Sequence, residues 1–377
     1  MDSFNFIIVG AGIAGLGVAA ELAQRHRVLV IEREAHPAFH STGRSAALYL
    51  ESYGPPVIRQ LTAASRGFFE APPEGFAETP LLAPRGGLHI AREDQVDELE
   101  SLADDLAALG MPIERLGADE ARARVPILRP GYVARALGEP GAMDIDAHAL
   151  QLGFQRVARR AGATLNLQAE LMAADYAQGR WTVETPQGEA SAPVLIDAAG
   201  AWADAVAAKA GAAPLGLRPL RRTALVVAPP EGVDPRGWPA VVDVAETFYF
   251  KPDAGRILLS PADETPSDPC DAQADELDVA IAVDRVQQAA DLPVRRVERA
   301  WAGLRTFAPD RVPVVGFDAN VPGFFWLAGQ GGYGLQTAPA LARVAAALAQ
   351  GEGVPADIAA FGVADEALSP ARLSAKS

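Results

Sequence analysis

The chain has 377 residues, enough for two domains or for one domain with a large insertion, and its 49% hydrophobic and 21% charged residues are ordinary for an enzyme. Its formal net charge of −15 argues against nucleic acid as a partner, because phosphate backbones would be repelled. The single cysteine, Cys270, excludes an internal disulfide and favours a cytoplasmic location.

The first predicted elements form a nucleotide-binding unit. An apolar strand, Phe4 to Val9, leads into Gly10-Ala11-Gly12-Ile13-Ala14-Gly15, an Ala-rich helix and a second strand that ends at Glu32. In G-x-G-x-x-G the glycines permit a tight turn, a close approach to pyrophosphate and close helix–strand packing, while the helix N-terminus supplies N–H donors. Glu32 can accept a hydrogen bond from a ribose 2′-hydroxyl. The unit therefore predicts a dinucleotide site, without saying which dinucleotide.

The chain then alternates between two kinds of pattern. A polar loop, residues 40–47, is suited to lining a cofactor, and Pro/Gly-rich turns followed by a helical pattern from Glu93 to Leu109 indicate the first piece of a second domain. A helix capped by Asp146, a strand at Ala163 to Leu167 and an apolar run at Val194 to Gly200 return to the α/β layer.

From Arg218 to Phe307 short alternating runs are typical of antiparallel strands. The predicted fold class is therefore α/β: a Rossmann-like FAD-binding domain of the glutathione-reductase type interleaved with an α+β antiparallel-sheet substrate domain. We expect the FAD-binding domain to comprise residues 1–83, 139–217 and 308–377. The substrate-binding domain would comprise residues 84–138 and 218–307.

A second glycine-rich turn near the C-terminus distinguishes between cofactors. The strand Phe324 to Gly329 is followed by Gln330-Gly331-Gly332-Tyr333-Gly334-Leu335-Gln336 and a helix through Ala349. A nicotinamide enzyme needs one such turn, whereas a flavin enzyme brings a second helix N-terminus against the isoalloxazine, where negative charge develops on reduction. FAD is therefore favoured over NAD. The alternative is that these glycines only form a tight turn.

The apolar stretches are too short to cross a bilayer. Ala11 to Ala23 and Val344 to Ala349 fall below the roughly 20 residues required. The chain also enters its first strand by residue 4 without a cleavable leader. No transmembrane segment is expected, while peripheral membrane contact and the oligomeric state stay open.

Five further segments carry a resemblance to a known family: His40–Ala47, Leu61–Arg66, Tyr249–Gly255, Trp301–Arg305 and Gln330–Gly334. Through them nearly the whole chain resembles the D-amino acid oxidase family of FAD enzymes, which includes glycine and sarcosine oxidases. Within that family it is most similar to the FAD-dependent D-arginine dehydrogenases. The resemblance implies non-covalent FAD, with the substrate held over the flavin and its Cα hydrogen aimed at N5.

Carried over position by position, the resemblance implies that Arg222, Arg305 and Tyr249 clamp the substrate carboxylate and that the Gly332 carbonyl faces the amine. Tyr53, between Ser52 and Gly54, is interpreted as a mobile loop aromatic that covers the pocket, and simple packing is the alternative. With the glycine motifs, the resemblance assigns the following residues to FAD: Gly10, Gly12, Ile13, Ala14, Gly15, Glu32, Arg33, Ser41, Thr42, Gly43, Arg44, Ser45, Ala46, Ala47, Leu48, Leu171, Gly200, Gly303, Gly331, Gly332, Tyr333, Gly334, Leu335 and Gln336. No metal site is predicted.

The chemistry itself favours such a clamp. A forked guanidinium pair with a phenol fixes a carboxylate while hydride leaves the neighbouring carbon. From sequence alone, Arg222, just before a strand, and Arg305, just after an apolar stretch, are more typical of surface arginines. His89, on an expected strand, and His148, in a helical first turn, are interpreted as structural.

Two departures from the D-arginine pattern concern the substrate. Gly87 stands where a carboxylate would receive a basic side chain, and Leu48 stands where a histidine would lie near the amine. A cationic side chain there would lack its partner. The expected pocket consists of Leu48, Leu50, Gly87, Ala240, Val242 and Gln336. This pattern predicts oxidation of neutral or hydrophobic D-amino acids to imino acids, which water hydrolyses to 2-oxo acid and ammonia.

Several alternatives stay open. The substrate could instead be D-arginine or D-lysine, an N-alkyl or cyclic imino acid, or a 2-hydroxy acid, since the clamp binds any carboxylate. The electron acceptor could be O₂ or a quinone. A nucleotide-binding regulatory or tRNA-associated protein is the alternative from another class, and the acidic charge argues against it.

Overall fold

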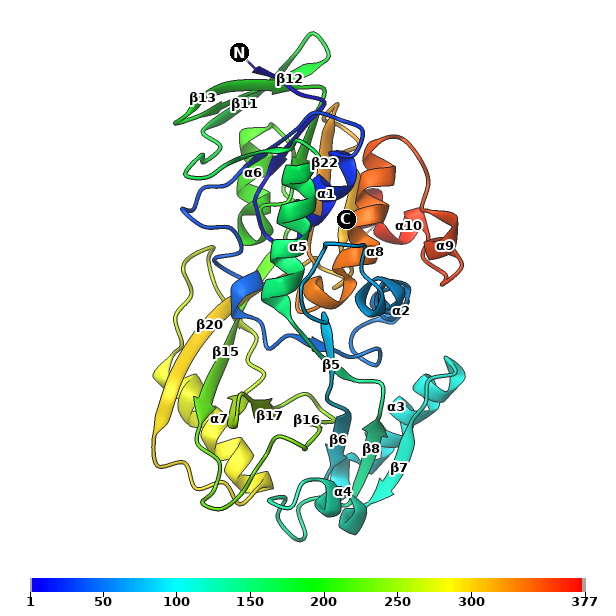
Figure 1. The fold of residues 1–377 in the computed structure, drawn as a ribbon, viewed down its shortest axis with the longest axis vertical. Helices are drawn as coiled ribbons and strands as arrows, with labels where there is room; N and C mark the ends of the chain where they lie inside the picture. The colour runs from blue at the N-terminus through cyan, green and yellow to red at the C-terminus, as the bar shows by residue number, and fades with distance from the viewer. Residues whose placement is uncertain (1, 375–377) are drawn as a thin grey trace.

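The structure, a computed structural model, describes residues 2–374. Two large β-sheets, of six and nine strands, and two smaller ones, of four and three strands, organise the chain. In Figure 1 the four-stranded sheet lies in the upper part and the nine-stranded sheet in the lower part. The predicted combination of an α/β nucleotide-binding layer with a second, mainly antiparallel sheet is confirmed.

The six-stranded sheet has the order β10 (Thr164–Asn166), β3 (Val28–Ile31), β2 (Phe6–Val9), β14 (Val194–Asp197), β22 (Phe324–Ala328) and β21 (Val314–Phe317). The first five strands are parallel and β21 is antiparallel to β22. β2, β3 and β22 are buried throughout, as strands covered on both faces must be. Their carboxyl ends, where ligands bind in such sheets, point to one edge.

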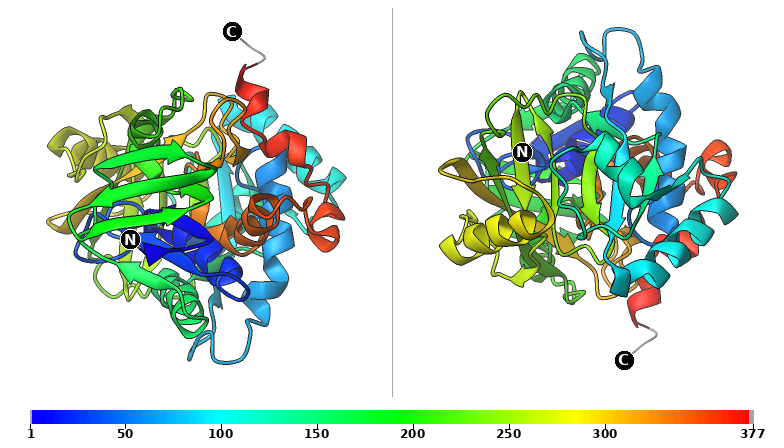
Figure 2. Two further views of the ribbon diagram at one scale, coloured as in Figure 1. Left: turned by 90° about the horizontal axis from the view of Figure 1, so that it is seen from above. Right: turned by 90° about the horizontal axis from the view of Figure 1, so that it is seen from below.

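Different elements cover the two faces of this sheet. Helices α1 (Ile13–Leu22), α5 (Ala147–Arg160) and α8 (Gly334–Ala349) pack on the face that carries Ile8 and Ile196. The other face, which carries Ile7 and Trp326, packs under Trp181 of the four-stranded sheet. That sheet has the order β1 (Asp2–Ser3), β13 (Gly188–Ala192), β12 (Arg180–Thr185) and β11 (Ala173–Ala177), and Figure 2 shows it in the view from above.

The nine-stranded sheet begins with β19 (Thr265–Pro266), β15 (Arg218–Val227), β18 (Arg256–Ser260) and β17 (Tyr249–Asp253), and continues with β16 (Ala240–Asp243), β6 (Gly87–Ala91), β8 (Arg135–Glu139) and β7 (Glu114–Gly117). The long strand β20 (Val297–Phe307) pairs with β15 along its length. Neighbouring strands are antiparallel except β16 and β6, which are parallel. The expectation of a purely antiparallel sheet is wrong at that pair, where two distant segments of the chain meet.

A helix interrupts the segment expected to hold only strands. α7 (Glu276–Ala289) begins after Asp275, whose side chain accepts a hydrogen bond from the Leu277 N–H at 2.9 Å. Its buried Ala282, Val286 and Ala289 pack against the face of the sheet that carries Phe250. The helical spacing of these small apolar residues was present in the sequence, but the surrounding strand pattern obscured it.

The remaining helices are α2 (Pro56–Glu70), α3 (Val96–Ala108), α4 (Ala118–Arg124), α6 (Ala203–Lys209), α9 (Ala356–Ala359), α10 (Asp365–Leu368) and α11 (Ala371–Ser374), with 3₁₀ turns η1 (Thr42–Arg44), η2 (Glu93–Gln95) and η3 (Gly200–Trp202). A three-stranded sheet joins β4 (Leu48–Tyr49), β9 (Met143–Ile145) and β5 (Leu82–Pro84). As expected, the Asp146 side chain caps α5 by accepting from the Ala149 N–H at 2.8 Å. Within residues 2–374 no helix is both long and apolar enough to span a membrane.

Candidate active site

Two adjoining cavities lie between the six-stranded and the nine-stranded sheet. The nucleotide cavity is lined by the ends of β2, β3 and β14 and by the starts of α1 and α8. The side cavity, of about 680 Å³, extends over the nine-stranded sheet toward β6. Both are lined by Ser45, Ala46, Arg222, Tyr249, Arg305, Gly332 and Leu335. A ligand in one cavity can therefore reach a ligand in the other.

The first glycine motif shapes the nucleotide cavity in the way its spacing predicts. Gly10 has φ +104°, and a Cβ added to it would lie 2.6 Å from the Ala198 carbonyl oxygen. A Cβ at Gly15 would lie 1.9 Å from the Gly10 carbonyl oxygen, so α1 could not pack so close to β2. At Gly12 the nearest atom is 3.6 Å away, which leaves the backbone open to the cavity. Glycine at positions 10 and 15 thus allows close backbone packing, and glycine at position 12 leaves room for a ligand to approach the backbone.

Two helix N-termini face the nucleotide cavity. α1 begins after Gly12 and α8 after Tyr333; neither N-cap residue accepts a hydrogen bond through a side chain, and neither first turn holds an acidic residue. In α1 the Ile13 N–H donates to the Thr42 hydroxyl at 3.1 Å, and the next N–H groups stay free of partners within residues 2–374. The residues that open both helices line the cavity. Free N–H groups and the positive ends of two helix dipoles favour negative charge at two separate points. This arrangement fits FAD, whose pyrophosphate would take one and whose isoalloxazine would take the other.

Glu32 marks the far end of the nucleotide cavity. Its carboxylate accepts hydrogen bonds from the N–H groups of Ala11, at 2.7 Å, and Glu34, at 3.0 Å. His40, in the loop expected to line a cofactor, has its ring 4.5 Å from that of Trp202, which sequence reasoning missed, and its Nε2 2.9 Å from Glu34 Oε1. The Trp202 ring also lies 4.9 Å below the Arg33 guanidinium. The sequence signal for Trp202 is its position two residues after Gly200, at the end of an apolar strand.

The structure divides the residues assigned to FAD into three groups. Most of them line the nucleotide cavity. Ala47, Leu48, Tyr333 and Gln336 line only the adjoining side cavity, and their assignment to the cofactor stays a prediction. Gly15 and Gly43 line neither, because each packs on backbone; a Cβ at Gly43 would lie 2.9 Å from the Ala38 carbonyl oxygen.

The loop that includes η1 is fixed against β20. The Arg44 guanidinium donates to the carbonyl oxygens of Ala302, at 3.0 Å, and Ala272, at 2.7 Å, and also pairs with Asp271. A Cβ at Gly303 would lie 3.1 Å from the Arg44 Cβ, which explains the glycine there. The loop expected to be irregular is therefore a turn held on both sides.

Arg222 and Arg305 lie on one face of adjacent strands. Arg222 of β15 is opposite Gly303 of β20, and Arg305 is opposite Leu220, two residues from Arg222. Paired residues and those two apart share a face of the sheet. The expectation that Arg222 lies just before a strand is wrong, since both arginines lie inside strands, and both line the two cavities.

The two guanidinium groups lie close together, with Arg222 buried and Arg305 half-buried. Arg222 donates to the Asp263 carbonyl oxygen at 2.7 Å and to Glu264 at 3.3 Å, and Arg305 donates to the Tyr53 hydroxyl at 3.0 Å. Burial, and then the charge of Arg305, lower the pKa of Arg222. Burial acts against the charge of Arg305 as well, but the phenols of Tyr53 and Tyr249 raise its pKa on balance. Positive charge concentrated in this way favours an anionic ligand.

Tyr53 and Gly332 complete this end of the side cavity. The Tyr53 ring packs edge-on against Tyr333, with 4.9 Å between centroids. A Cβ at Gly332 would lie 2.8 Å from an Arg305 nitrogen and 3.1 Å from the Tyr53 hydroxyl. Tyr53, expected as a mobile cover, is thus held next to the guanidinium pair, and only glycine fits beside them.

The rest of the side cavity follows the same face of the sheet. Val242 of β16 is paired with both Tyr249 of β17 and His89 of β6, which places the three in one row. Leu48, Leu50, Val242 and Gln336 line the cavity as expected, whereas Gly87 and Ala240 do not. A Cβ at Gly87 would meet the Leu50, Ala142 and Glu139 side chains at 3.3–3.5 Å. The space expected there is filled, and His89, interpreted as purely structural, lines the cavity.

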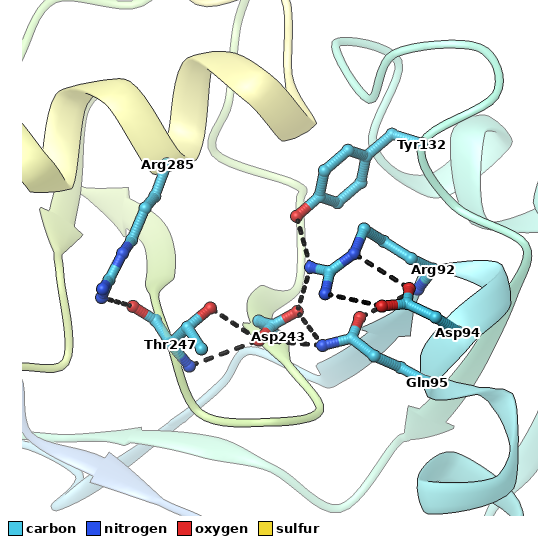
Figure 3. Close-up of polar contacts among 7 residues, drawn as sticks. All are labelled: Arg92, Asp94, Gln95, Tyr132, Asp243, Thr247 and Arg285. Carbon is cyan, nitrogen blue, oxygen red and sulfur yellow. Dashed lines mark hydrogen bonds and ion pairs between the residues drawn. The ribbon is translucent and has the colours of Figure 1, made fainter.

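A buried carboxylate fixes the β16–β17 hairpin, which carries Tyr249. Asp243, at the end of β16, accepts from the Thr247 hydroxyl at 2.7 Å and from the Gln95 amide at 3.3 Å (Figure 3). Arg285 of α7 donates to the Thr247 carbonyl oxygen at 2.6 Å and to Pro261 at 2.7 Å. The network joins the hairpin to α7 and to the segment before α3.

Comparison with known proteins agrees with this geometry. A family described as FAD dependent oxidoreductase matches residues 5–348. Glycine oxidase of Geobacillus kaustophilus is 26% identical over 95% of this chain and 96% of its own length. Glycine oxidase of Pseudomonas aeruginosa is 29% identical over 93% of this chain and 95% of its own length.

Solved structures agree in fold. The crystal structure of the Geobacillus enzyme superposes with a TM-score of 0.84 at 24% identity, covering 96% of this chain and 98% of that one. An L-α-glycerophosphate oxidase from Mycoplasma pneumoniae with FAD bound gives a TM-score of 0.83 at 21% identity, covering 93% of this chain and 95% of that one. The shared fold extends over both cavities.

Proposed function

This chain belongs to the family of FAD-dependent oxidoreductases, and from that premise we propose that it oxidises an amino acid at Cα, yielding an imino acid that water hydrolyses to 2-oxo acid and ammonia. FAD is its cofactor, and when bound it supplies the acceptor for the hydride. The observation that carries the proposal is the pair Arg222 and Arg305, which lines both cavities.

The residues of the chain would orient the substrate. Two forked guanidinium groups can take both oxygens of a carboxylate, and Tyr53 and Tyr249 line the same space. With the carboxylate fixed, the Cα–H bond is directed toward the nucleotide cavity, and the Gly332 backbone carbonyl is positioned to accept from the amine. Orientation of this kind lowers the barrier by removing rotational freedom before the reaction.

The amine must lose a proton before or while hydride leaves. Leu48, where a histidine would lie near the amine, cannot accept it, so the proton passes to solvent or to a tyrosine. We therefore expect the rate of FAD reduction to rise with pH through a single ionisation and to reach an alkaline plateau. A stopped-flow profile that is flat between about pH 6 and 10 would contradict this.

The substrate class that we favour is a neutral or hydrophobic D-amino acid. The middle of the side cavity is lined by the apolar side chains of Leu48, Leu50, Val242 and Phe248. The glycine oxidase relatives suggest that glycine should be included in a panel with D-leucine, D-phenylalanine, D-proline and D-arginine. Anaerobic bleaching of the flavin measures each substrate. Much faster bleaching by D-arginine than by D-leucine would overturn this preference.

A second candidate is oxidation of a 2-hydroxy acid in the same site. It is favoured by one observation: the paired guanidinium groups recognise a carboxylate, whatever heteroatom Cα carries. Release of ammonia during turnover distinguishes the two reactions, because a hydroxy acid gives the 2-oxo acid without ammonia.

A further inference from the structure

Three buried polar residues lie at the end of the side cavity away from the guanidinium pair. Ser52, His89 and Glu139 are 4%, 7% and 2% exposed, and the first two line the cavity. Amino acid oxidation by the guanidinium pair and FAD gives these three residues no role. A role for them in binding the substrate side chain rests on that proposed function.

Glu139 supplies a carboxylate next to Gly87, the position at which the D-arginine pattern would have one. It lies on β8 directly opposite Gly87 of β6, and a Cβ at Gly87 would be 3.3 Å from its Cβ. Directly paired residues share a face of the sheet. A carboxylate is therefore present on the neighbouring strand instead of at position 87, but Glu139 does not line the cavity itself.

The oxygens of Glu139 are already bound within the protein. Oε2 accepts from the Ser52 hydroxyl at 2.5 Å and lies 3.3 Å from His89 Nε2, while Oε1 accepts from the Ser52 N–H at 3.3 Å. Burial acts to raise the pKa of Glu139, but the hydrogen bond and charge of His89 and the bonds from Ser52 lower it on balance. Glu139 is thus an ionised, buried group that fixes the imidazole of His89.

His89 presents the remaining polar edge to the cavity. Its Nε2 is engaged by Glu139 and Ser52, which leaves Nδ1 available to a ligand. His89 is separated from Tyr249 by one strand, because both are paired with Val242. Two strand spacings are about 10 Å, so a substrate whose carboxylate lies near Tyr249 would direct a side chain of several bonds toward His89.

We propose that His89, positioned by Glu139, binds the far end of the substrate side chain, and that this end is an uncharged hydrogen-bonding group such as a carboxamide. Both oxygens of Glu139 are bound within the protein and Glu139 does not line the cavity, so it offers no free carboxylate to a cationic end. The exposed rim of the cavity includes Glu98, Asp105 and Glu246, which disfavours an anionic end. The substrate is then apolar along its middle and polar at its tip.

The experiment uses the FAD-loaded protein and two ligands of similar length. Glutaramate, the monoamide of glutarate, and hexanoate share a carboxylate and differ at the tip, and their binding is followed through the flavin absorbance. We expect the native protein to prefer glutaramate and His89→Leu to lose about three- to tenfold in its affinity, with hexanoate unchanged or tighter. His148→Leu, an exposed histidine of α5, is the matched control and should change neither.

A second variant guards against misfolding. His89→Leu leaves the Glu139 charge without its partner, so the double variant H89L/E139Q, which removes that charge, is measured in parallel and should show the same loss. An equal change for both ligands, or none, would overturn the role of His89. Ligand binding is measured here without turnover, so it is independent of the reaction. If no amino acid reduced the bound FAD but the preference for glutaramate still depended on His89, the proposed function would be refuted and the role of His89 in binding would stand.

Discussion

Arg222 and Arg305 carry like charges on adjacent strands, an arrangement that is stabilised when an anion occupies the space between them. Arg222 is partly compensated by Glu264, which also pairs with Arg311 at 2.7 Å. Arg305 has the Tyr53 hydroxyl as its side-chain partner. The less compensated group, Arg305, is therefore the one that a substrate carboxylate would engage most directly.

Replacing Arg305 by lysine tests the clamp. A lysine keeps the charge but cannot form two parallel hydrogen bonds, and losing one bond to a charged group costs about 1.5–3 kcal/mol. We expect kcat/KM for the best amino acid to fall about ten- to 150-fold, as those energies imply. The control is Arg299→Lys on the exposed part of the same strand, which should leave kcat/KM unchanged. Equal effects of the two variants would contradict the assignment.

Asp197, at the end of β14, is a buried acid that links stability to pH. Its Oδ1 accepts from the Ala199 N–H at 3.1 Å, Oδ2 has no partner among residues 2–374, and burial raises its pKa well above the usual value. The folded state thus holds a proton that the unfolded chain releases near pH 3.9, so stability falls as pH rises through the folded pKa.

Asn at position 197 keeps the acceptor but cannot ionise. We expect Asp197→Asn to raise Tm relative to the native protein by more at pH 8 than at pH 5, as measured by calorimetry at both values. A Tm difference that is the same at the two pH values would show that Asp197 does not titrate in this window.

At the scale of elements, the turn before α8 depends on a backbone shape that side chains disfavour. Gly331 has φ +55°, and a Cβ there would lie 2.2 Å from the Phe307 ring. Its N–H donates to the Thr306 carbonyl oxygen at 2.8 Å, which ties the turn to β20. The structure is therefore compatible with both interpretations of Gly331, Gly332 and Gly334: that they form a tight turn, and that they contact the cofactor.

Gly331→Ala separates packing from backbone strain when it is compared with Gly351→Ala. Gly351 also has positive φ, at +79°, but a Cβ there meets no atom within 4 Å. We expect Gly331→Ala to cost about 1–3 kcal/mol more, because the overlap with Phe307 must be relieved by movement of the turn. It should also weaken FAD binding, measured by fluorescence titration, whereas Gly351→Ala should not. Equal FAD affinities would place the turn outside the cofactor site.

The elements also show where sequence patterns suffice and where they fail. The parallel strands, α1, α5 and α8 were predictable because long apolar runs, an Asp cap and glycine turns are local signals. The parallel pairing of β16 with β6 was not, since residues 87–91 and 240–243 are far apart in the chain and neither pattern encodes its partner. Without that pairing, His89 could not be placed in the row with Val242 and Tyr249.

At the scale of the whole molecule, the nucleotide cavity is assembled from distant parts of the chain. Its walls come from the starts of α1 and α8 and from the ends of β3 and β14. Binding FAD therefore joins segments that the unfolded chain cannot hold together, so FAD stabilises the folded state by mass action.

Removal of FAD should lower the stability of the entire protein. With free FAD at 100 times its Kd, the free energy of unfolding should rise by about 2.7 kcal/mol over the FAD-free protein, and Tm should increase with FAD concentration. NAD at the same concentration is the control and should leave Tm unchanged. A Tm that does not depend on FAD would mean that these segments do not contact the cofactor.

The candidate site was predicted unevenly, for physical reasons. Gly10 and Gly12 act through backbone geometry that the motif spacing reveals, and Glu32 is found from its place at the end of the second strand. Arg222 and Arg305 were found through a family resemblance, because a buried and a surface arginine look alike in one sequence. The position of Glu139 opposite Gly87 across a strand pair requires the register, which only the folded structure gives.

The parallel pairing of β16 with β6 also separates two groups of residues to which different roles are proposed. The guanidinium pair lies on β15 and β20, whereas His89 and Glu139 lie on β6 and β8, within the separate stretch of residues 87–139. A stretch attached to the sheet at one seam can change its side chains while the groups that hold the carboxylate stay in place. On the proposed roles, exchange of residues 87–139 would alter the group that meets the tip of the substrate side chain while leaving the guanidinium pair in place.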